Sequence, residues 1–180
     1  MSVAQAHRRL GVAVVGLGGA VATTAVAGIE VIKKGANRLE GLPLAEVNVP
    51  GLTDYRDMVF GGWDLDGSDL ASAAAHHKVL TDAQMRETSE ALSEIKPFAA
   101  VGSGAWCKGV TGRNARETTG HRAAVEAIAK DLERFRRDSG VDRVVMINLA
   151  STERMVRDGE IRDGKTICTL LYAAGFVFGM

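Results

Sequence analysis

A glycine-rich turn between two apolar segments is the first place in this sequence where residue types and spacing suggest binding chemistry. Residues 16–19 read GLGG and are followed by Ala20 and Val21. At Gly18 and Gly19 the backbone can approach a pyrophosphate closely, and a helix that starts at Ala20 would direct its unpaired amides and positive dipole end at the same anion. Because valine stands where a third glycine is usual, a tight strand–helix turn without a ligand is the alternative.

Asp64 is the second candidate, since it follows a believable strand. A carboxylate in that place can accept both hydroxyls of an adenosine ribose, and the usual spacing from the glycines is about 20 residues. Asp64 lies 46 positions beyond Gly18, whereas Glu40 fits the spacing better but sits in a segment without a strand pattern. We therefore choose Asp64 and attribute the additional residues between Gly18 and Asp64 to an insertion. Its alternative role is a turn aspartate that caps the next helix.

The third candidate follows the last convincing strand, residues 144–147. Ala150, Ser151 and Thr152 offer small side chains, hydroxyls and backbone groups beside a cofactor. A plain helix N-cap at Ser151 or Thr152 is the alternative.

Strands that alternate with helices must position these three turns. Apolar runs predict strands at 11–16, at 58–60 leading into a turn at 61–64, and at 144–147; helices are expected at 20–34, 68–78, 81–96 and 125–139. This alternation predicts an α/β fold with a parallel sheet covered on both faces. Ligands bind beyond the carboxyl ends of such strands, where all three turns would lie.

The helices carry their own local signals. In the first, Val21, Ala25, Ile29 and Ile32 fall along one face, and Gly35 suits the position after its end.

The next helices have caps that the sequence suggests. Ser68 is the expected N-cap of the second helix, and residues 81–84 (TDAQ) form a capping-box pattern with Leu80 and Met85 as its hydrophobic staple. That helix should stop before Pro97.

The last helix is amphipathic and ends at a glycine. Val125, Ile128, Leu132 and Phe135 mark its apolar face, and Gly140 closes it.

The amino terminus also resembles an export signal. Residues 7–27 combine Arg8 and Arg9 with an apolar stretch and a small-residue site at 25–27. We favour the strand–turn–helix interpretation, because an export signal has no need of a helix that ends in two lysines and Gly35.

Charge and cysteine usage exclude several functions. Lysine plus arginine equals aspartate plus glutamate, at 22 each, which removes the general electrostatic case for nucleic acid or an acidic membrane surface. Cys107 and Cys168 show no metal-binding spacing and indicate reduced thiols in a cytoplasmic protein. Adjacent His76 and His77 would point to different sides of a helix, so we interpret them as helix surface and expect no metal site.

Three regions divide the chain. We expect a flexible N-terminus at 1–9, a nucleotide-binding domain at 10–154, and the start of a truncated second region at 155–180. Within the domain, 36–56 is predicted to be an irregular insertion and 102–120 a mobile loop.

The three turns together resemble those of the myo-inositol-phosphate synthases. The resemblance is carried by residues 16–24 (GLGGAVATT), 60–65 (FGGWDL) with Asp69-Leu70 and Lys78-Val79-Leu80, and 144–154 (VVMINLASTER). It implies a Rossmann-type NAD domain and an isomerase of inositol and phospholipid biosynthesis that converts glucose 6-phosphate to inositol phosphate by NAD-dependent oxidation, enolisation, aldol closure and reduction. It also implies a homo-oligomer, which is a tetramer in the full-length family.

Transferred by motif, the resemblance assigns cofactor contacts along all three turns. Gly16, Gly18, Gly19, Ala20 and Val21 would line the pyrophosphate, Asp64 would hold the adenosine ribose, and Ala150, Ser151 and Thr152 would lie nearer the nicotinamide.

This chain also departs from the family pattern. Residues 20–22 (AVA) replace a common Asn-Asn-Gly, Ser151 replaces a common asparagine, and the family is roughly twice as long, with its catalytic residues beyond position 180. The uncharged residues 166–180 are too few for a membrane span of about 20 residues. We therefore assign no catalytic residue and expect an NAD-binding part that is inactive alone. The alternatives are a non-catalytic nucleotide-binding module, a fragment of another Rossmann dehydrogenase, or a structural domain whose glycine turn is empty.

Overall fold

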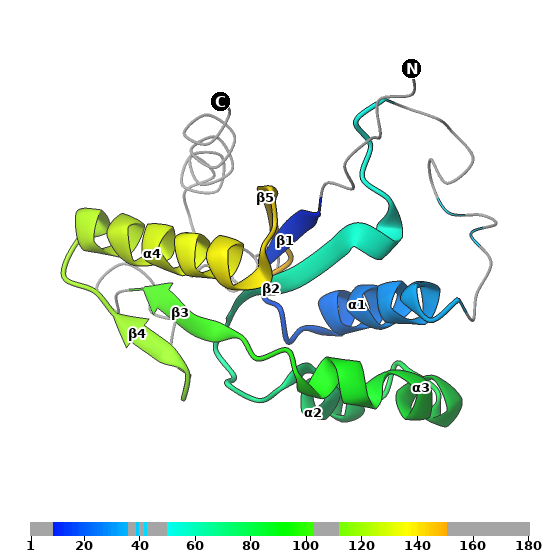
Figure 1. Cartoon of the computed structure of the whole chain (residues 1–180). Helices are drawn as coiled ribbons and strands as arrows, with labels where there is room; N and C mark the ends of the chain where they lie inside the picture. Colours follow the sequence, from blue (N-terminus) through cyan, green and yellow to red (C-terminus); the bar gives the residue numbers. More distant parts are fainter. Residues whose placement is uncertain (1–8, 36–38, 40–41, 43–49, 103–111, 151–180) are drawn as a thin grey trace, which may run out of the picture.

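A five-stranded, all-parallel sheet forms the centre of the protein. The computed structural model describes residues 9–35, 39, 42, 50–102 and 112–150. Within them the strands are β1 Leu10–Val15, β2 Met58–Asp64, β3 Phe98–Gly102, β4 Ala115–Glu117 and β5 Arg143–Asn148. Their spatial order is β4-β3-β2-β1-β5 (Figure 1). The predicted α/β fold with a parallel sheet is confirmed.

Four helices cover the sheet on both faces. They are α1 Ala20–Lys33, α2 Leu70–His77, α3 Asp82–Ser93 and α4 His121–Ser139, and a 3-10 turn at Tyr55–Asp57 precedes β2. Helix α4 lies on one face, whereas α1 lies on the other with α2 and α3 beside it (Figure 1). Residues of the interior strands β1 and β2 therefore point toward one helical layer or the other, whereas most residues of the edge strands β4 and β5 are exposed.

The side chains of β1 alternate between two apolar clusters. Val12 and Val14 pack with the cluster that contains Val26 of α1, while Ala13 packs with Trp63 and Phe135 on the side of α4. Because both faces are covered, the central residues of β1 are continuously buried. Strand β1 is accordingly an interior strand of the sheet, between β2 and β5.

Strand β2 continues through the two glycines that the sequence analysis assigned to a turn. Gly61 lies under the ring of Phe135, because a Cβ there would stand 2.7 Å from Phe135 Cε2. Gly62 has φ +146° and would bring a Cβ within 1.9 Å of the Val14 carbonyl oxygen. The glycines here permit close packing of helix and strand, and the turn begins only after Asp64.

The predicted apolar face of α1 was partly wrong. Val21 is 67% exposed and Ala25 is exposed, whereas Ile29 and Ile32 are buried as expected. The helix packs against α2 and α3 as well as the sheet. The buried face of α1 therefore differs from the predicted one and includes residues such as Val26. The end of the helix matches the prediction, since Gly35 adopts φ +71° after the C-cap Lys34.

Cap predictions were correct for α3 and wrong for α2. The side chain of Asp69 caps α2 by accepting the Ser72 amide, so Asp69 takes the place predicted for Ser68. The capping box of Thr81 and Gln84 is present at α3.

The other predictions concern the packing and the ends of α3 and α4. Leu80 and Met85 pack against one apolar cluster, and α3 ends at Ser93, before Pro97. Helix α4 ends at Gly140, which adopts φ +62°. On the predicted apolar face of α4, Phe135 is buried but Val125 is 64% exposed, because only the C-terminal part of that face reaches the cluster around Phe135.

The region 102–120 is more regular than predicted. Ala115–Glu117 forms the edge strand β4, which pairs in parallel with β3, and Asn114 fixes its start by hydrogen bonds to the neighbouring strands. Residues 103–111 lie outside the described part, as do most of 36–49 and the cysteines Cys107 and Cys168. Because 1–8 and 151–180 also lie outside it, the predicted division at 1–9, 10–154 and 155–180 stays a prediction.

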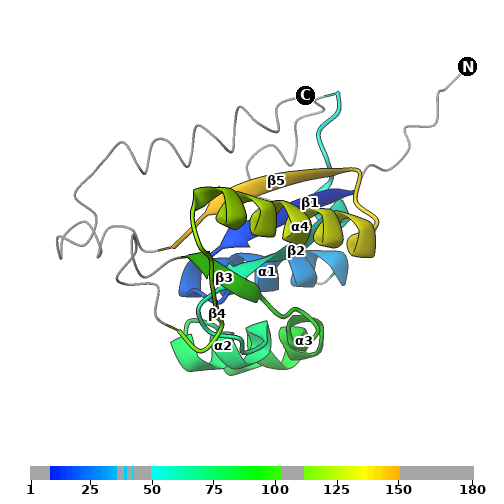
Figure 2. The ribbon, with the colours of Figure 1, turned by 90° about the vertical axis from the view of Figure 1, so that its left-hand side faces the viewer.

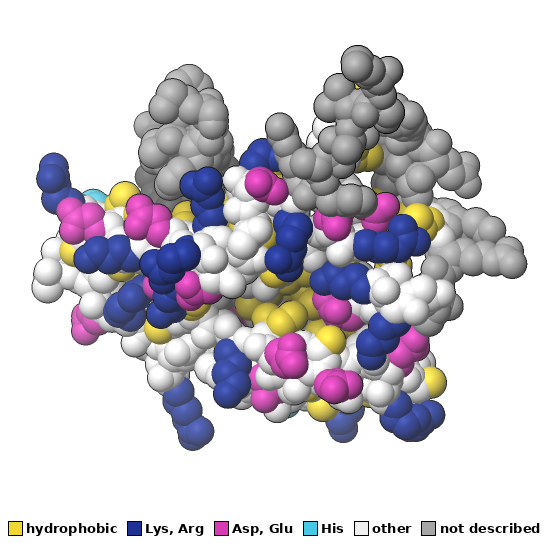
Figure 3. Space-filling model, in the orientation of Figure 1, with side chains coloured by type: hydrophobic (Ala, Val, Ile, Leu, Met, Phe, Trp, Pro, Cys, Tyr) yellow, Lys and Arg dark blue, Asp and Glu magenta, His cyan; other side chains and the backbone are white. Residues whose placement is uncertain are grey.

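Acidic and basic side chains are interspersed on the face shown in Figure 3, in keeping with the balanced composition.

In the described ranges, no helix combines the length and the apolar character that crossing a bilayer requires. The same ranges contain no group of three or more His, Cys, Asp or Glu residues placed to hold a metal ion.

The packing of β1 against β2 predicts opposite effects for two glycine substitutions. Gly62→Ala should lower the free energy of unfolding by about 3 kcal/mol or more, since it combines an unfavourable φ with a backbone clash. Gly28→Ala, in the exposed part of α1 where a Cβ meets nothing within 4 Å, should raise it by about 0.5–1 kcal/mol. Urea denaturation measures both; equal stabilities would contradict the close β1–β2 approach.

Candidate functional site

The carboxyl ends of β1, β2 and β5 meet at one edge of the sheet. Val15, the last residue of β1, is paired with Trp63 and Asn148 in the neighbouring strands. Figure 2 shows the three strands side by side, and they run parallel to one another. We call residues 16–19, Asp64 and Ala150 the carboxyl rim; the structure thus brings together one representative of each predicted turn.

Gly16 joins the first turn to the third. Its φ of +85° favours glycine, and a Cβ there would lie 3.0 Å from the Ala150 backbone nitrogen. Ala150 is itself held in place, because its amide donates to Asn148 Oδ1 at 3.0 Å. Ser151 and Thr152, the other predicted residues of the third turn, lie outside the described residues.

Asp64 joins the first turn to the second. Its Oδ2 accepts the Gly18 amide at 2.8 Å, and its Oδ1 accepts the Asp66 amide at 3.0 Å. A carboxylate offers about four lone-pair sites, so two remain for other donors. The half-buried Asp64 side chain thus contacts the glycine turn and can still accept further hydrogen bonds at the rim.

The N-terminus of α1 has no side-chain cap and no acidic residue in its first turn. Its N-cap residue is Gly19. The first backbone bond of the helix runs from the Thr23 amide to the Gly19 carbonyl, so the amides of Ala20, Val21 and Ala22 are those that a helix leaves without a partner of its own. Together with the helix dipole, they form a site for negative charge.

Two further carboxylates order the loop after Asp64. The hydrogen bond from the Ser68 amide lowers the pKa of Asp66 below its usual range, and the Ser72 amide does the same to the pKa of Asp69. Both side chains thus serve the loop and the start of α2.

Sequence reasoning missed two residues that hold the rim. His77 is exposed, as predicted, but its Nε2 lies 2.8 Å from the Gly18 carbonyl oxygen. Asn114 Nδ2 donates to the Asp64 carbonyl at 3.0 Å and to the Phe98 carbonyl at 3.1 Å. The only sequence signal for His77 was its place in the last turn of the helix that follows Asp64. Asn114 lay in a segment interpreted as a loop and had no signal.

A buried carboxylate next to the end of β2 pairs with two exposed arginines. Asp131 of α4 is only 4% exposed; its Oδ2 accepts the Trp63 indole N–H at 3.0 Å and pairs with Arg116. Its Oδ1 lies 3.7 Å from Arg134 Nη2. Since Trp63 directly precedes Asp64 in β2, this network fixes the end of that strand from the side of α4.

Comparison with known proteins decides the family. A model of an NAD-binding family, described as Myo-inositol-1-phosphate synthase, matches residues 43–171. The chain belongs to the myo-inositol-1-phosphate synthase family. The matched range includes Asp64 and Ala150 and begins after the glycine turn.

Relatives of known name agree with this family. The chain is 34% identical over 158 residues to inositol-3-phosphate synthase 1 of Bacteroides thetaiotaomicron, an alignment that covers 81% of this chain and 37% of that protein. It is 29% identical over 181 residues to inositol-3-phosphate synthase isozyme 1 of Arabidopsis thaliana, which covers 81% of this chain and 34% of the relative. The chain therefore spans about a third of the length of the synthases that it matches.

A solved structure supports the fold. The crystal structure of inositol-3-phosphate synthase from Caenorhabditis elegans matches with a TM-score of 0.62 and 20% identity, over 79% of this chain and 34% of that one. At this identity the match supports the synthase-like fold alone.

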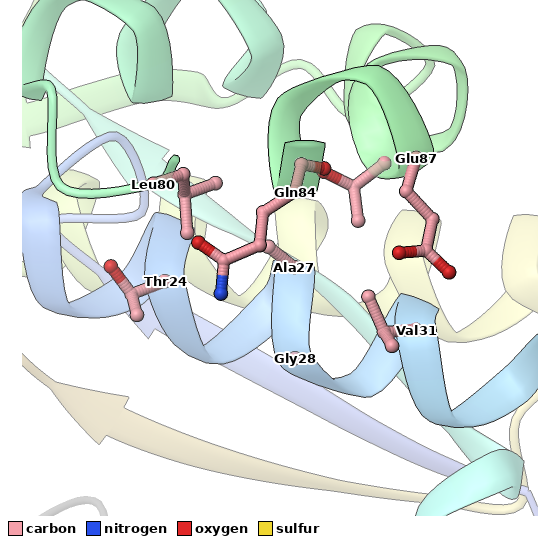
Figure 4. A pocket seen from close by; sticks show the side chains of 8 residues that line it. Thr24, Ala27, Gly28, Val31, Leu80, Gln84 and Glu87 are labelled. Atoms are coloured by element: carbon pink, nitrogen blue, oxygen red, sulfur yellow. The ribbon is translucent and has the colours of Figure 1, made fainter. Parts of the chain in front are cut away.

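The groove between α1 and α3 is separate from the rim of this synthase-family domain. It is lined by Thr24, Ala27, Gly28, Val31, Leu80, Gln84, Glu87 and Thr88. Figure 4 shows the labelled residues of this set on the two sides of the groove. None of them is a predicted site residue, so we place the candidate site at the rim.

Removal of the buried carboxylate tests the support at the end of β2. Asp131→Ala leaves the Trp63 N–H without its acceptor, and we expect a loss of about 1–3 kcal/mol in the free energy of unfolding. Asp138→Ala is the control on the same helix: its pair with Arg137 is exposed, and its effect should stay within about 0.5 kcal/mol. Urea titration followed by tryptophan fluorescence measures both; similar effects of the two variants would contradict the buried role of Asp131.

Proposed function

We propose that this chain binds NAD at the carboxyl rim, as the NAD-binding part of an inositol-3-phosphate synthase. The pyrophosphate would lie against Gly18 and Gly19 and the first-turn amides of Ala20 and Val21, with Gly16 shaping the turn. The uncapped start of α1 and its lack of acidic residues support this placement.

Asp64 would hold the adenosine ribose. The carboxylate uses two acceptor sites for the Gly18 and Asp66 amides, and the remaining two match the two ribose hydroxyls. A 2′-phosphate would place a second negative charge beside this carboxylate, so NAD should be preferred to NADP.

The third turn would lie along the nicotinamide half of the cofactor. Ala150 lies against Gly16, and Ser151 and Thr152 follow it in the chain. When bound, NAD supplies an acceptor for a hydride that it later returns. The family substrate that we propose is glucose 6-phosphate, converted to inositol phosphate in a homo-oligomeric, cytoplasmic enzyme. We assign no catalytic residue in this chain.

The observation that carries the proposal is the hydrogen bond from the Gly18 amide to Asp64 Oδ2, at 2.8 Å. It joins the expected pyrophosphate turn to the expected ribose carboxylate across 46 residues of sequence. The family membership of the chain supports the same assignment.

Calorimetry with NAD tests the site. The purified chain should bind NAD more tightly than NADP, and Asp64→Asn should weaken NAD binding roughly 10- to 100-fold, because hydrogen bonds to a charged acceptor contribute about 1.5–3 kcal/mol. Asp66→Asn, two residues away, should bind as the wild type does. A folded chain that does not bind NAD would contradict the proposal.

An assay for turnover of glucose 6-phosphate tests whether the chain is catalytically active on its own. Because the chain spans about a third of its relatives, we expect no formation of inositol phosphate by the purified chain with NAD. A nucleotide-binding module without catalysis is the alternative. Product detected by phosphorus NMR would exclude that alternative and would show that catalytic residues lie within these 180 residues.

A further inference from the structure

His77 connects the last turn of α2 to the glycine turn. Its Nε2 lies 2.8 Å from the Gly18 carbonyl oxygen, although 59 residues separate the two in sequence. The amide of the same glycine donates to Asp64 Oδ2 at 2.8 Å. Gly18 is thus held through both of its backbone polar groups by two side chains, one at the end of β2 and one at the end of α2.

The two contacts fix two different peptide planes. Asp64 holds the peptide that precedes Gly18, and His77 holds the peptide that follows it. Because a trans peptide directs its C=O and N–H to opposite sides, a carbonyl held toward α2 directs the Gly19 amide the other way, where it donates to the Gly16 carbonyl at 3.1 Å. This second peptide is therefore held at both ends, by His77 at its carbonyl and by the Gly16 carbonyl at its amide.

Without that donor the turn has alternatives. Glycine adopts a wide range of φ and ψ, so consecutive glycines allow the peptide between them to rotate. A rotated peptide would lose the bond from the Gly19 amide to the Gly16 carbonyl and would turn the Gly18 carbonyl to that side of the glycine turn, where its negative end disfavours an anion. Fixing this peptide keeps the site compatible with a phosphate before any ligand arrives.

We propose that His77 is a positioning residue for dinucleotide binding: its Nε2–H donates to the Gly18 carbonyl and keeps the glycine turn in the orientation that accepts a pyrophosphate. The inference rests on the proposed NAD site and adds to it a residue outside the three predicted turns. In this role His77 acts through the backbone of the turn.

Helix α2 itself offers a matched control. His76 precedes His77, is also exposed, and places its ring edge-on to that of His77 with centroids 5.6 Å apart. Substitution of His76 changes the same helix end and removes the same side-chain type while leaving the donor to Gly18 in place. A general effect on α2 would appear in both variants, whereas a positioning effect would appear at His77 alone.

Calorimetric titration with NAD tests the role in the full chain. His77→Met has a similar length and no donor, and its NAD affinity should be about three- to tenfold weaker, as loss of one hydrogen bond predicts. His77→Gln restores a donor at similar reach and should bind as the wild type does, as should His76→Ala. Met and Gln have similar helix propensities, so urea midpoints of the two His77 variants should agree.

The outcomes separate the two proposals. A wild-type chain that does not bind NAD contradicts the proposed function. A wild-type chain that binds NAD while His77→Met binds equally well overturns the role of His77 alone. Equal weakening in the Met and Gln variants also overturns it, because the donor then makes no difference.

A measurement without ligand gives a second test. In amide NMR spectra of the free chain, His77→Met should shift the signals of Gly18 and Gly19 and speed hydrogen exchange at Gly19, whereas His77→Gln should leave both glycines near their wild-type positions. Unchanged glycine signals in the Met variant would show that His77 does not set the peptide orientation.

Discussion

The carboxyl rim depends on the hydrogen bonds that the backbone carbonyl of Trp63 accepts. This carbonyl accepts the amides of Gly16 and Leu17 at 2.9 and 3.1 Å, and so ties the chain that leaves β1 to the end of β2. This contact sets where the glycine turn stands relative to the next residue, Asp64. The carboxylate can meet the Gly18 amide only because the two strand ends are held in this register.

Trp63 is in turn held by the core on the side of α4. Its indole N–H donates to the buried Asp131, and its ring lies 6.1 Å from that of Phe98, over which Arg134 stacks at 4.4 Å. The carboxyl rim and the hydrophobic layer therefore share one residue, the rim through its backbone carbonyl and the layer through its side chain. A disturbance of α4 packing reaches the rim through the backbone of β2, without any direct contact between α4 and a ligand.

Local patterns were predictable from the sequence, and contacts between distant residues were not. The capping box at Thr81 depends on four consecutive residues, so the sequence alone specifies it. The glycines at 61–62 follow turn statistics, but Phe135 and the neighbouring strand decide that they lie in β2. His77 and Asn114 contact the rim across 59 and 50 residues of sequence. Only the folded sheet brings such pairs together.

The unusual distance between Gly18 and Asp64 has a simple geometric reason. In a parallel unit the helix returns the chain to the amino edge of the sheet, so residues between α1 and β2 are added at the end opposite the rim. Each doubling of a flexible connection costs only about 0.6 kcal/mol in closure entropy. Homologous chains can therefore vary in length at this point, by insertion or deletion, with little thermodynamic penalty and no change in the geometry of the carboxyl rim.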